Sequence, residues 1–137
     1  MRSRLPRLLI LALALGMVAA ACSKKSESGE GGKITINGES ANNHGTKDFS
    51  GKSEGDVEMD NFYFDPTVIK GSPGQTLRLK FGNDGKTLHN FTLGGKDMGD
   101  VQPGSDATFT VTFPQSGILE FHCKYHQSSG MVGELSA

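Results

Sequence analysis

The sequence predicts an all-β domain, built as a sandwich or barrel of short strands. From residue 57 onward, apolar and polar residues alternate in short runs, and Gly, Pro, Asn and Asp interrupt these runs at intervals. No window of ten or more residues shows a helical period, and the 19 glycines favour turns over helices. Six or seven short strands in about 80 residues are typical of an antiparallel sandwich or barrel.

The expected strands follow the alternation in chain order. The clearest runs, residues 76–81 and 107–113, place every second residue on one apolar face. The turn segments Gly-Ser-Pro-Gly at 71–74 and Asn-Asp-Gly at 83–85 bound the first of these runs. The other strands are expected at residues 57–64, 66–69, 90–93, 118–123 and 131–135, with Met59 in the core and His122 pointing outward. Met98 and the charges Lys96, Asp97 and Asp100 are expected in a solvated loop.

A signal peptide is predicted for residues 1–21. Three arginines precede the apolar run 8–21, which is too short for a stable membrane span. The run ends Ala-Ala-Ala-Cys, and this end resembles the lipobox of bacterial lipoproteins, whose cysteine is lipidated and becomes the mature N-terminus. The resemblance implies lipidation of Cys22 and an extracytoplasmic protein anchored to a bacterial membrane, at the cell surface or on the periplasmic side. An ordinary A-x-A secretory cleavage site is the alternative.

Residues 22–56 are predicted to form a flexible tether, because they are rich in Gly, Ser, Lys and Glu and contain few apolar residues. Within them, residues 33–38 are a candidate for a short strand at the domain edge, and His44 is expected to be solvated. The folded domain is therefore expected at residues 57–137.

The charge balance and the two cysteines limit the classes of function. Removal of residues 1–21 takes away three arginines and no acid, which leaves 11 basic and 15 acidic residues. This balance gives no reason to expect a nucleic-acid partner. Cys22 and Cys123 would ordinarily form one disulfide in a secreted chain, but a lipid on Cys22 excludes that pairing.

Soft metal ligands gather near the C-terminus. Cys123, His126 and Met131 follow the spacing C-x-x-H-x-x-x-x-M, and a loop that leaves the sheet at Cys123 and re-enters it at Met131 brings them to one point. A thiolate with an imidazole and a weak thioether suits copper, especially when a second imidazole completes the set. His89, just before the strand at 90–93, supplies that imidazole. The alternative is a buried cysteine beside two unrelated histidines.

With these residues, the segment 57–137 resembles the cupredoxins, the blue-copper electron carriers, and its ligand loop resembles that of plastocyanins. The resemblance implies a Greek-key β-sandwich with one type 1 copper site near one end. It also implies that His89, Cys123 and His126 are the strong ligands and that Met131 is the axial one. Other matching positions are Phe64-Asp65-Pro66, Asn83, Asn90-Phe91, Pro103-Gly104 and Gly117.

Two loop positions depart from the plastocyanin pattern. Lys124 stands where serine is usual after the cysteine, and Tyr125 stands where proline is usual before the second histidine. Unlike proline, Tyr125 keeps a backbone N–H that can point at the Cys123 sulfur. We expect this N–H to stabilise the thiolate and to raise the reduction potential.

Two functions are compatible with a membrane-tethered cupredoxin. The first is a one-electron shuttle between redox proteins of a membrane electron-transfer chain. The second is a protein for copper scavenging, buffering or delivery, which usually carries additional Met or His clusters, and none is visible in the sequence. No side chain is placed as a general base, and neither an oxyanion hole nor a substrate pocket is indicated, so we expect no enzymatic activity. A monomer is expected.

Overall fold

The computed structural model of the 137-residue chain describes residues 31–137. The predicted signal peptide, residues 1–21, and the lipidation of Cys22 lie outside the described residues. Within the described range the chain is almost entirely β, as predicted, and its regular helical structure is one turn of 3₁₀-helix. The elements are β1 Gly32–Ile36, β2 Glu39–Asn43, β3 Thr46–Asp48, β4 Glu54–Asp60, β5 Tyr63–Asp65, β6 Val68–Lys70, β7 Thr76–Asn83, β8 His89–Leu93, β9 Lys96–Val101, β10 Asp106–Thr112, β11 Ile118–His122, η1 Gln127–Ser129 and β12 Val132–Ser136.

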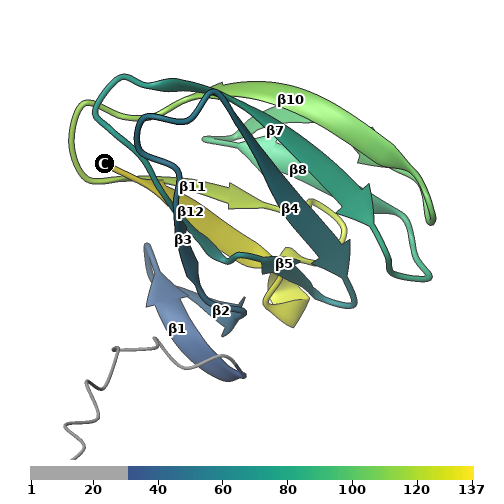
Figure 1. Ribbon diagram of the computed structural model, residues 1–137. Helices are drawn as coiled ribbons and strands as arrows, with labels where there is room; N and C mark the ends of the chain where they lie inside the picture. The colour runs from purple at the N-terminus through teal and green to yellow at the C-terminus, as the bar shows by residue number, and fades with distance from the viewer. Residues whose placement is uncertain (1–30) are drawn as a thin grey trace, which may run out of the picture.

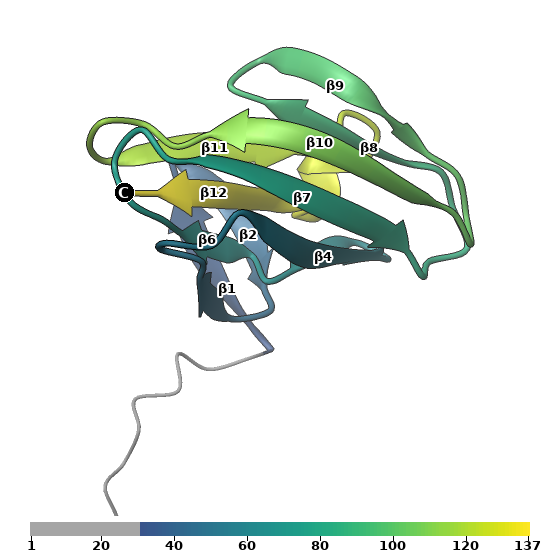
Figure 2. The same ribbon diagram turned by 45° about the horizontal axis from the view of Figure 1, so that its top comes forward.

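Two sheets form a β-sandwich, and a separate hairpin lies outside it (Figures 1 and 2). The first sheet has the strand order β10-β7-β4-β5, and the second has the order β3-β6-β12-β11-β8-β9. The hairpin β1–β2 pairs only with itself in the strand ladders and packs beside β12. No helix within residues 31–137 has the length and apolar character needed to cross a membrane.

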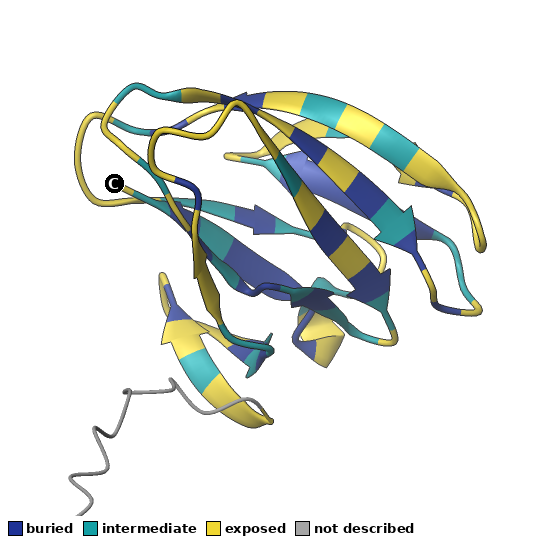
Figure 3. Ribbon diagram, viewed as in Figure 1, coloured by how far each residue is buried: buried dark blue, intermediate teal, exposed yellow. Residues whose placement is uncertain are grey.

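The alternation in the sequence places the core between the sheets. In β7, Leu77, Leu79 and Phe81 are completely buried, while the residues between them are exposed to solvent. Figure 3 shows this alternation as bands along the strands of the four-stranded sheet. In the antiparallel pair β7–β10, Leu79 lies opposite Phe109, so the apolar faces of both strands point the same way. The core also contains Cys123 and Met131, two of the predicted metal ligands.

The predicted sandwich is confirmed, but the expected antiparallel pairing was wrong for three strand pairs. Strand β4 pairs in parallel with β7, and β6 pairs in parallel with both β12 and β3. Between β4 and β7, the chain passes through β5 and then through β6 in the opposite sheet, so β7 returns beside β4 in the same direction. Alternation along one strand indicates which residues are buried, but it carries no information about the direction of the neighbouring strand.

The prediction of a flexible tether over residues 22–56 was also wrong for its described part. Residues 31–56 contain β1, β2, β3 and the start of β4, so this segment belongs to the folded domain, which does not start at residue 57. The segment has few apolar residues, but Ile36 and Ala41 are buried against Val132 of β12, and Phe49 joins the main core. The hairpin needs no core of its own, because its apolar residues pack against β12 of the larger sheet.

Residues 96–101 form strand β9, where a solvated loop was expected. Met98 packs against the main core instead of lying in a loop. A β-bulge at Phe91/Thr92 shifts the pairing register between β8 and β9, and the short strand is mostly polar. These two features hide the alternation that would have identified the strand.

Candidate metal centre

Three of the four predicted ligands lie at the ends of neighbouring strands of one sheet. His89 begins β8, Cys123 follows β11 directly, and Met131 directly precedes β12. His126 lies between them, just before η1. The Cys123 N–H donates to the Met131 carbonyl at 3.0 Å, and the Met131 N–H donates to the His126 carbonyl at 3.2 Å. These bonds close the loop, so Met131 returns to the core beside Cys123.

The structure brings one ligand atom from each of His89, Cys123 and His126 within 4.8 Å of one another. The Nδ1 atoms of the two histidines are 3.2 Å apart, and Nδ1 of His126 is 3.4 Å from the Cys123 sulfur. Within residues 31–137, this is the one group of three or more His, Cys, Asp or Glu side chains with this spacing.

This donor spacing fits a metal ion. Nitrogen and thiolate ligands lie about 2.0 and 2.3 Å from a bound metal, so two ligands of one metal lie about 3 to 4 Å from each other. Two Nδ1 lone pairs that face each other at 3.2 Å need a proton or a cation between them. Met131 is buried and is joined by backbone hydrogen bonds to Cys123 and His126, so the set of two imidazoles, a thiol and a thioether is suited to a single type 1 copper ion.

Burial sets the protonation states of the metal-binding side chains in the metal-free protein. It lowers the pKa of His89 to about 4, with a smaller contribution from His126, and it also lowers the pKa of His126. Both imidazoles are therefore neutral near pH 7 and present lone pairs. Burial raises the pKa of the Cys123 thiol, so the metal-free protein holds a proton there that metal binding releases.

A glycine makes room for the His89 ring on the side away from the other ligands. A Cβ at Gly85 would lie 2.9 Å from His89 Nε2 and 2.9 Å from Asn61 Oδ1. The Nε2 atom is buried and has no hydrogen-bond partner in the described structure. When Nδ1 is the ligand, Nε2 carries the proton of the neutral imidazole, so the loop at Gly85 must accommodate an N–H group.

Phe62 shields the histidine side of the site. Its ring centroid is 4.4 Å from that of His126 and 6.5 Å from that of His89. His89, Cys123 and Met131 are fully buried, whereas His126 is partly exposed. The site therefore has a closed interior, and the imidazole of His126 is its approach to the surface. The role of Phe62 was not predicted, because an aromatic residue in an expected strand is ordinarily explained by packing in the core.

The Asn90 side chain ties the strand that carries His89 to the loop that carries Cys123. Its Nδ2 lies 2.8 Å from Asp97 Oδ1, 2.9 Å from Asp100 Oδ1 and 3.0 Å from the Gly99 carbonyl. Its Oδ1 accepts hydrogen bonds from Thr92 Oγ1 at 2.6 Å and from the Lys124 N–H at 3.5 Å. With Lys124 in place of the usual serine, the side-chain hydroxyl bound to Asn90 is that of Thr92.

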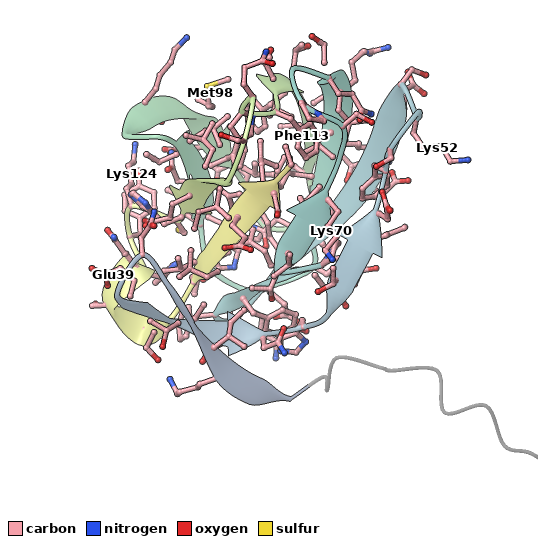
Figure 4. The ribbon with its side chains drawn as sticks, turned by 90° about the vertical axis from the view of Figure 1, so that its left-hand side faces the viewer. Glu39, Lys52, Lys70, Met98, Phe113 and Lys124 are labelled. Carbon is pink, nitrogen blue, oxygen red and sulfur yellow. The ribbon has the colours of Figure 1, made fainter. Side chains whose placement is uncertain are left out.

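Lys124 extends this network to the surface. Its ammonium group lies 2.7 Å from Asp97 and 3.2 Å from Asp100, and these contacts hold its pKa above the ordinary value, with Asp97 as the main cause. The Tyr125 hydroxyl donates to Asp100 at 2.8 Å. Figure 4 shows Lys124 at the periphery of the fold. The two aspartates are therefore bound to the ligand loop, not merely solvated as the sequence suggested.

Three backbone N–H groups act on the Cys123 sulfur. Those of Tyr125, Asn90 and His126 each lower the thiol pKa, in that order of strength, against the larger effect of burial. The Tyr125 N–H thus acts on the pKa of Cys123 in the direction predicted from the sequence, and the effect of the Asn90 N–H was not foreseen. Such bonds favour the thiolate over the thiol.

Three residues that the sequence placed outside the metal site also lie outside it in the structure. Met59 is buried in the main core, as predicted. The ring of His122 is partly exposed and lies 3.3 Å from the Glu120 carboxylate. His44 is not merely solvated, because its ring stacks on Tyr63 with 3.4 Å between centroids.

Comparison with known proteins identifies the family of this architecture. The sequence model of a family described as a cupredoxin-like domain matches residues 9–136 of the chain. Curated protein sequences give no significant match.

Solved structures agree on the fold. Dithionite-reduced auracyanin from the photosynthetic bacterium Roseiflexus castenholzii aligns with a TM-score of 0.50 and 17% identity, over 62% of this chain and 96% of the other. Auracyanin B gives a TM-score of 0.53 and 17% identity, over 61% and 87% of the two chains. A multicopper oxidase gives 0.50 and 17%, over 79% of this chain and 46% of the other.

Proposed function

This chain belongs to the cupredoxin-like domain family, and from that premise we propose that it carries single electrons between redox proteins outside the cytoplasm. The observation that carries the proposal is the convergence of His89, Cys123 and His126, whose ligand atoms lie within 4.8 Å of one another in a buried site. Together with Met131, these residues would hold one copper ion.

The protein's part is to keep the ligands still. Bound copper supplies a one-electron couple, and a site that changes little between oxidation states exchanges electrons with little reorganisation. Cys123 and Met131 belong to the main core, and Asn90 fixes the segment that follows Cys123. His89, Cys123 and Met131 are buried away from solvent, while the partly exposed His126 ring connects the site to the surface.

We further propose that Cys22 carries lipid and holds the protein on the outer side of a bacterial membrane. The lipobox-like sequence before Cys22 supports this location. The redox partners would then be proteins of the same membrane, and the carrier itself would be a monomer. Mass spectrometry of the mature N-terminus tests the anchor, because lipidation adds the mass of acyl chains to Cys22.

The visible and EPR spectra of the full chain loaded with Cu(II) test the copper site. We expect an intense visible thiolate-to-copper band, typical of blue sites, and a narrow hyperfine splitting. A colourless Cu(II) form with a wide splitting would contradict the type 1 assignment.

Copper exchange separates the carrier from a protein that handles copper. A carrier keeps its metal through repeated oxidation and reduction and exchanges electrons quickly with a small redox protein. A copper-handling protein releases Cu(I) readily to a chelator of moderate affinity. Met59 and Met98 are packed in or against the core, so neither forms an exposed thioether cluster for metal transfer.

A further inference from the structure

Asn42, on strand β2 of the N-terminal hairpin, is hydrogen-bonded to both segments that enclose the exposed side of the metal site. Its Nδ2 donates to the Ser129 carbonyl at 2.9 Å, and Ser129 lies in the loop between His126 and Met131. The same Nδ2 donates to the Phe62 carbonyl at 2.9 Å. The ring of Phe62 in turn lies 4.4 Å from the ring of His126.

The backbone of Asn42 is fixed at both of its polar groups. Its N–H donates to the Gly130 carbonyl at 2.9 Å, one residue before Met131. Its carbonyl accepts a hydrogen bond from Thr67 Oγ1 at 3.0 Å. Thr67 is fully buried, and its own carbonyl accepts from Glu134 of β12. Thr67 thus connects Asn42 to the sheet, and Asn42 is itself hydrogen-bonded to the loop at Ser129 and Gly130.

The contact between Asn42 and the loop is close. Gly130 has φ +91°, and a Cβ at this position would lie 2.9 Å from the Asn42 side chain. Directly after the loop, Val132 of β12 is fully buried against Ile36 and Ala41 of the hairpin. The loop 126–131 is therefore covered by a part of the chain that is far from it in sequence, as Figure 1 shows for β2 and β12.

We propose that Asn42 is a positioning residue for the copper site. By joining Ser129 and Phe62, it sets the distance between the loop that carries His126 and Met131 and the aromatic ring that covers His126. This inference rests on the proposed function. Groups that orient metal ligands commonly change metal affinity by about 10-fold to 100-fold when they are replaced.

Two variants of Asn42 and one control test the proposal in the full chain. Asn42→Ala removes both side-chain donations, and Asn42→Asp removes them while it keeps nearly the same shape. Ser40→Ala changes an exposed residue of the same strand and serves as the control. We expect copper transfer to a chelator to be about 10-fold faster in both Asn42 variants and unchanged in the control.

Hydrogen–deuterium exchange of the metal-free proteins provides a readout that does not depend on copper. In the Asn42 variants, amide exchange should rise in residues 126–131 and stay unchanged in β7 and β10. A rise throughout the domain would mean a general structural role and would overturn the proposal. Copper release and exchange equal to those of the wild type would overturn it as well.

The spectrum of the wild type separates this inference from its premise. If the wild-type protein lacks the blue band, the proposed function fails before any variant is compared. If the wild type is blue and both Asn42 variants behave like Ser40→Ala, only the role of Asn42 is overturned.

Discussion

The Nδ1 atoms of His89 and His126 lie 3.2 Å apart, although 37 positions separate the two residues in the chain. His89 lies at the start of β8, and His126 lies in the loop between β11 and β12. In the sheet, β11 lies between β8 and β12. The spacing is therefore fixed by the strand order and not by a local motif. The strand order thereby brings two histidines that are distant in the chain to the spacing of two ligands of one metal ion.

The two cysteines should have separable roles. Cys123→Ser removes the thiolate, so the visible thiolate-to-copper band should disappear while the fold, followed by far-UV circular dichroism, is retained. A blue Cys123→Ser protein would refute the ligand assignment.

Cys22→Ser should keep the band and lose the lipid, measured by mass spectrometry and by release from membranes. A Cys22→Ser protein that stays bound to membranes would refute the anchor.

Tyr125→Pro should lower the reduction potential. The substitution removes a backbone N–H that stabilises the Cys123 thiolate. A hydrogen bond of this kind contributes about 1 kcal/mol, which corresponds to about 40 mV for one electron. Tyr125→Phe is the matched control, because it loses the hydroxyl bond to Asp100 but keeps the N–H. Spectroelectrochemical titration measures both potentials, and equal values for Tyr125→Pro and the wild type would exclude the role of this N–H.

Gly133→Ala should destabilise the domain by about 1 to 3 kcal/mol. A Cβ at Gly133 would lie 2.4 Å from the Phe121 ring and 2.6 Å from the Thr67 carbonyl oxygen, so ring or backbone must move. Gly32→Ala is the control, since a Cβ there meets no atom within 4 Å. Urea unfolding of the metal-free proteins gives the free energies. A Gly133→Ala midpoint equal to that of Gly32→Ala would show that β12 is not packed this tightly.

The metal-free protein should lose stability as the pH falls from about 6.5 to about 4. Burial lowers the pKa of His89 from 6.5 to about 4. In this window the unfolded chain binds a proton that the folded protein does not, so stability is full above about pH 6.5 and the His89 contribution is gone below about pH 4.

The His89 contribution is on the order of 1 to 3 kcal/mol. The difference in unfolding free energy between wild type and His89→Gln, measured across this pH range, isolates it, because the carboxylates titrate in both proteins. His126 shifts in the same direction and remains in both. A difference that does not change with pH would contradict the burial of a neutral His89.

The sequence predicted the parts of the fold that repeat at period two. Leu77, Leu79 and Phe81 are buried as expected, because each alternates with an exposed neighbour in a strand between two partners. The convergence of His89, Cys123 and His126 was predicted because thiol and imidazole groups are few in this chain and their spacing suits a loop between strands. Both predictions depend on information that is local or chemically rare.

What the sequence did not show depends on contacts between distant segments. Asn42 is one of many polar residues in a Gly-rich and Ser-rich stretch, and only the folded loop shows that its amide meets Ser129 and Phe62. Ile36 and Ala41 have too few apolar neighbours in sequence to indicate a core, and they are buried by Val132 from the last strand. Likewise, Asp97 is an ordinary surface acid until Asn90 and Lys124 contact it.

Because residues 31–56 belong to the folded domain, the segment that can serve as a tether between Cys22 and the domain is shorter than predicted. With lipid on Cys22 as proposed, about nine residues separate the anchor from β1, which begins at Gly32. Fully extended, such a segment spans at most about 30 Å, whereas a flexible segment up to residue 56 would span more than about 100 Å. If Cys22 is lipidated as proposed, the protein would meet its electron donor and acceptor close to the lipid surface, by diffusing within the plane of the membrane.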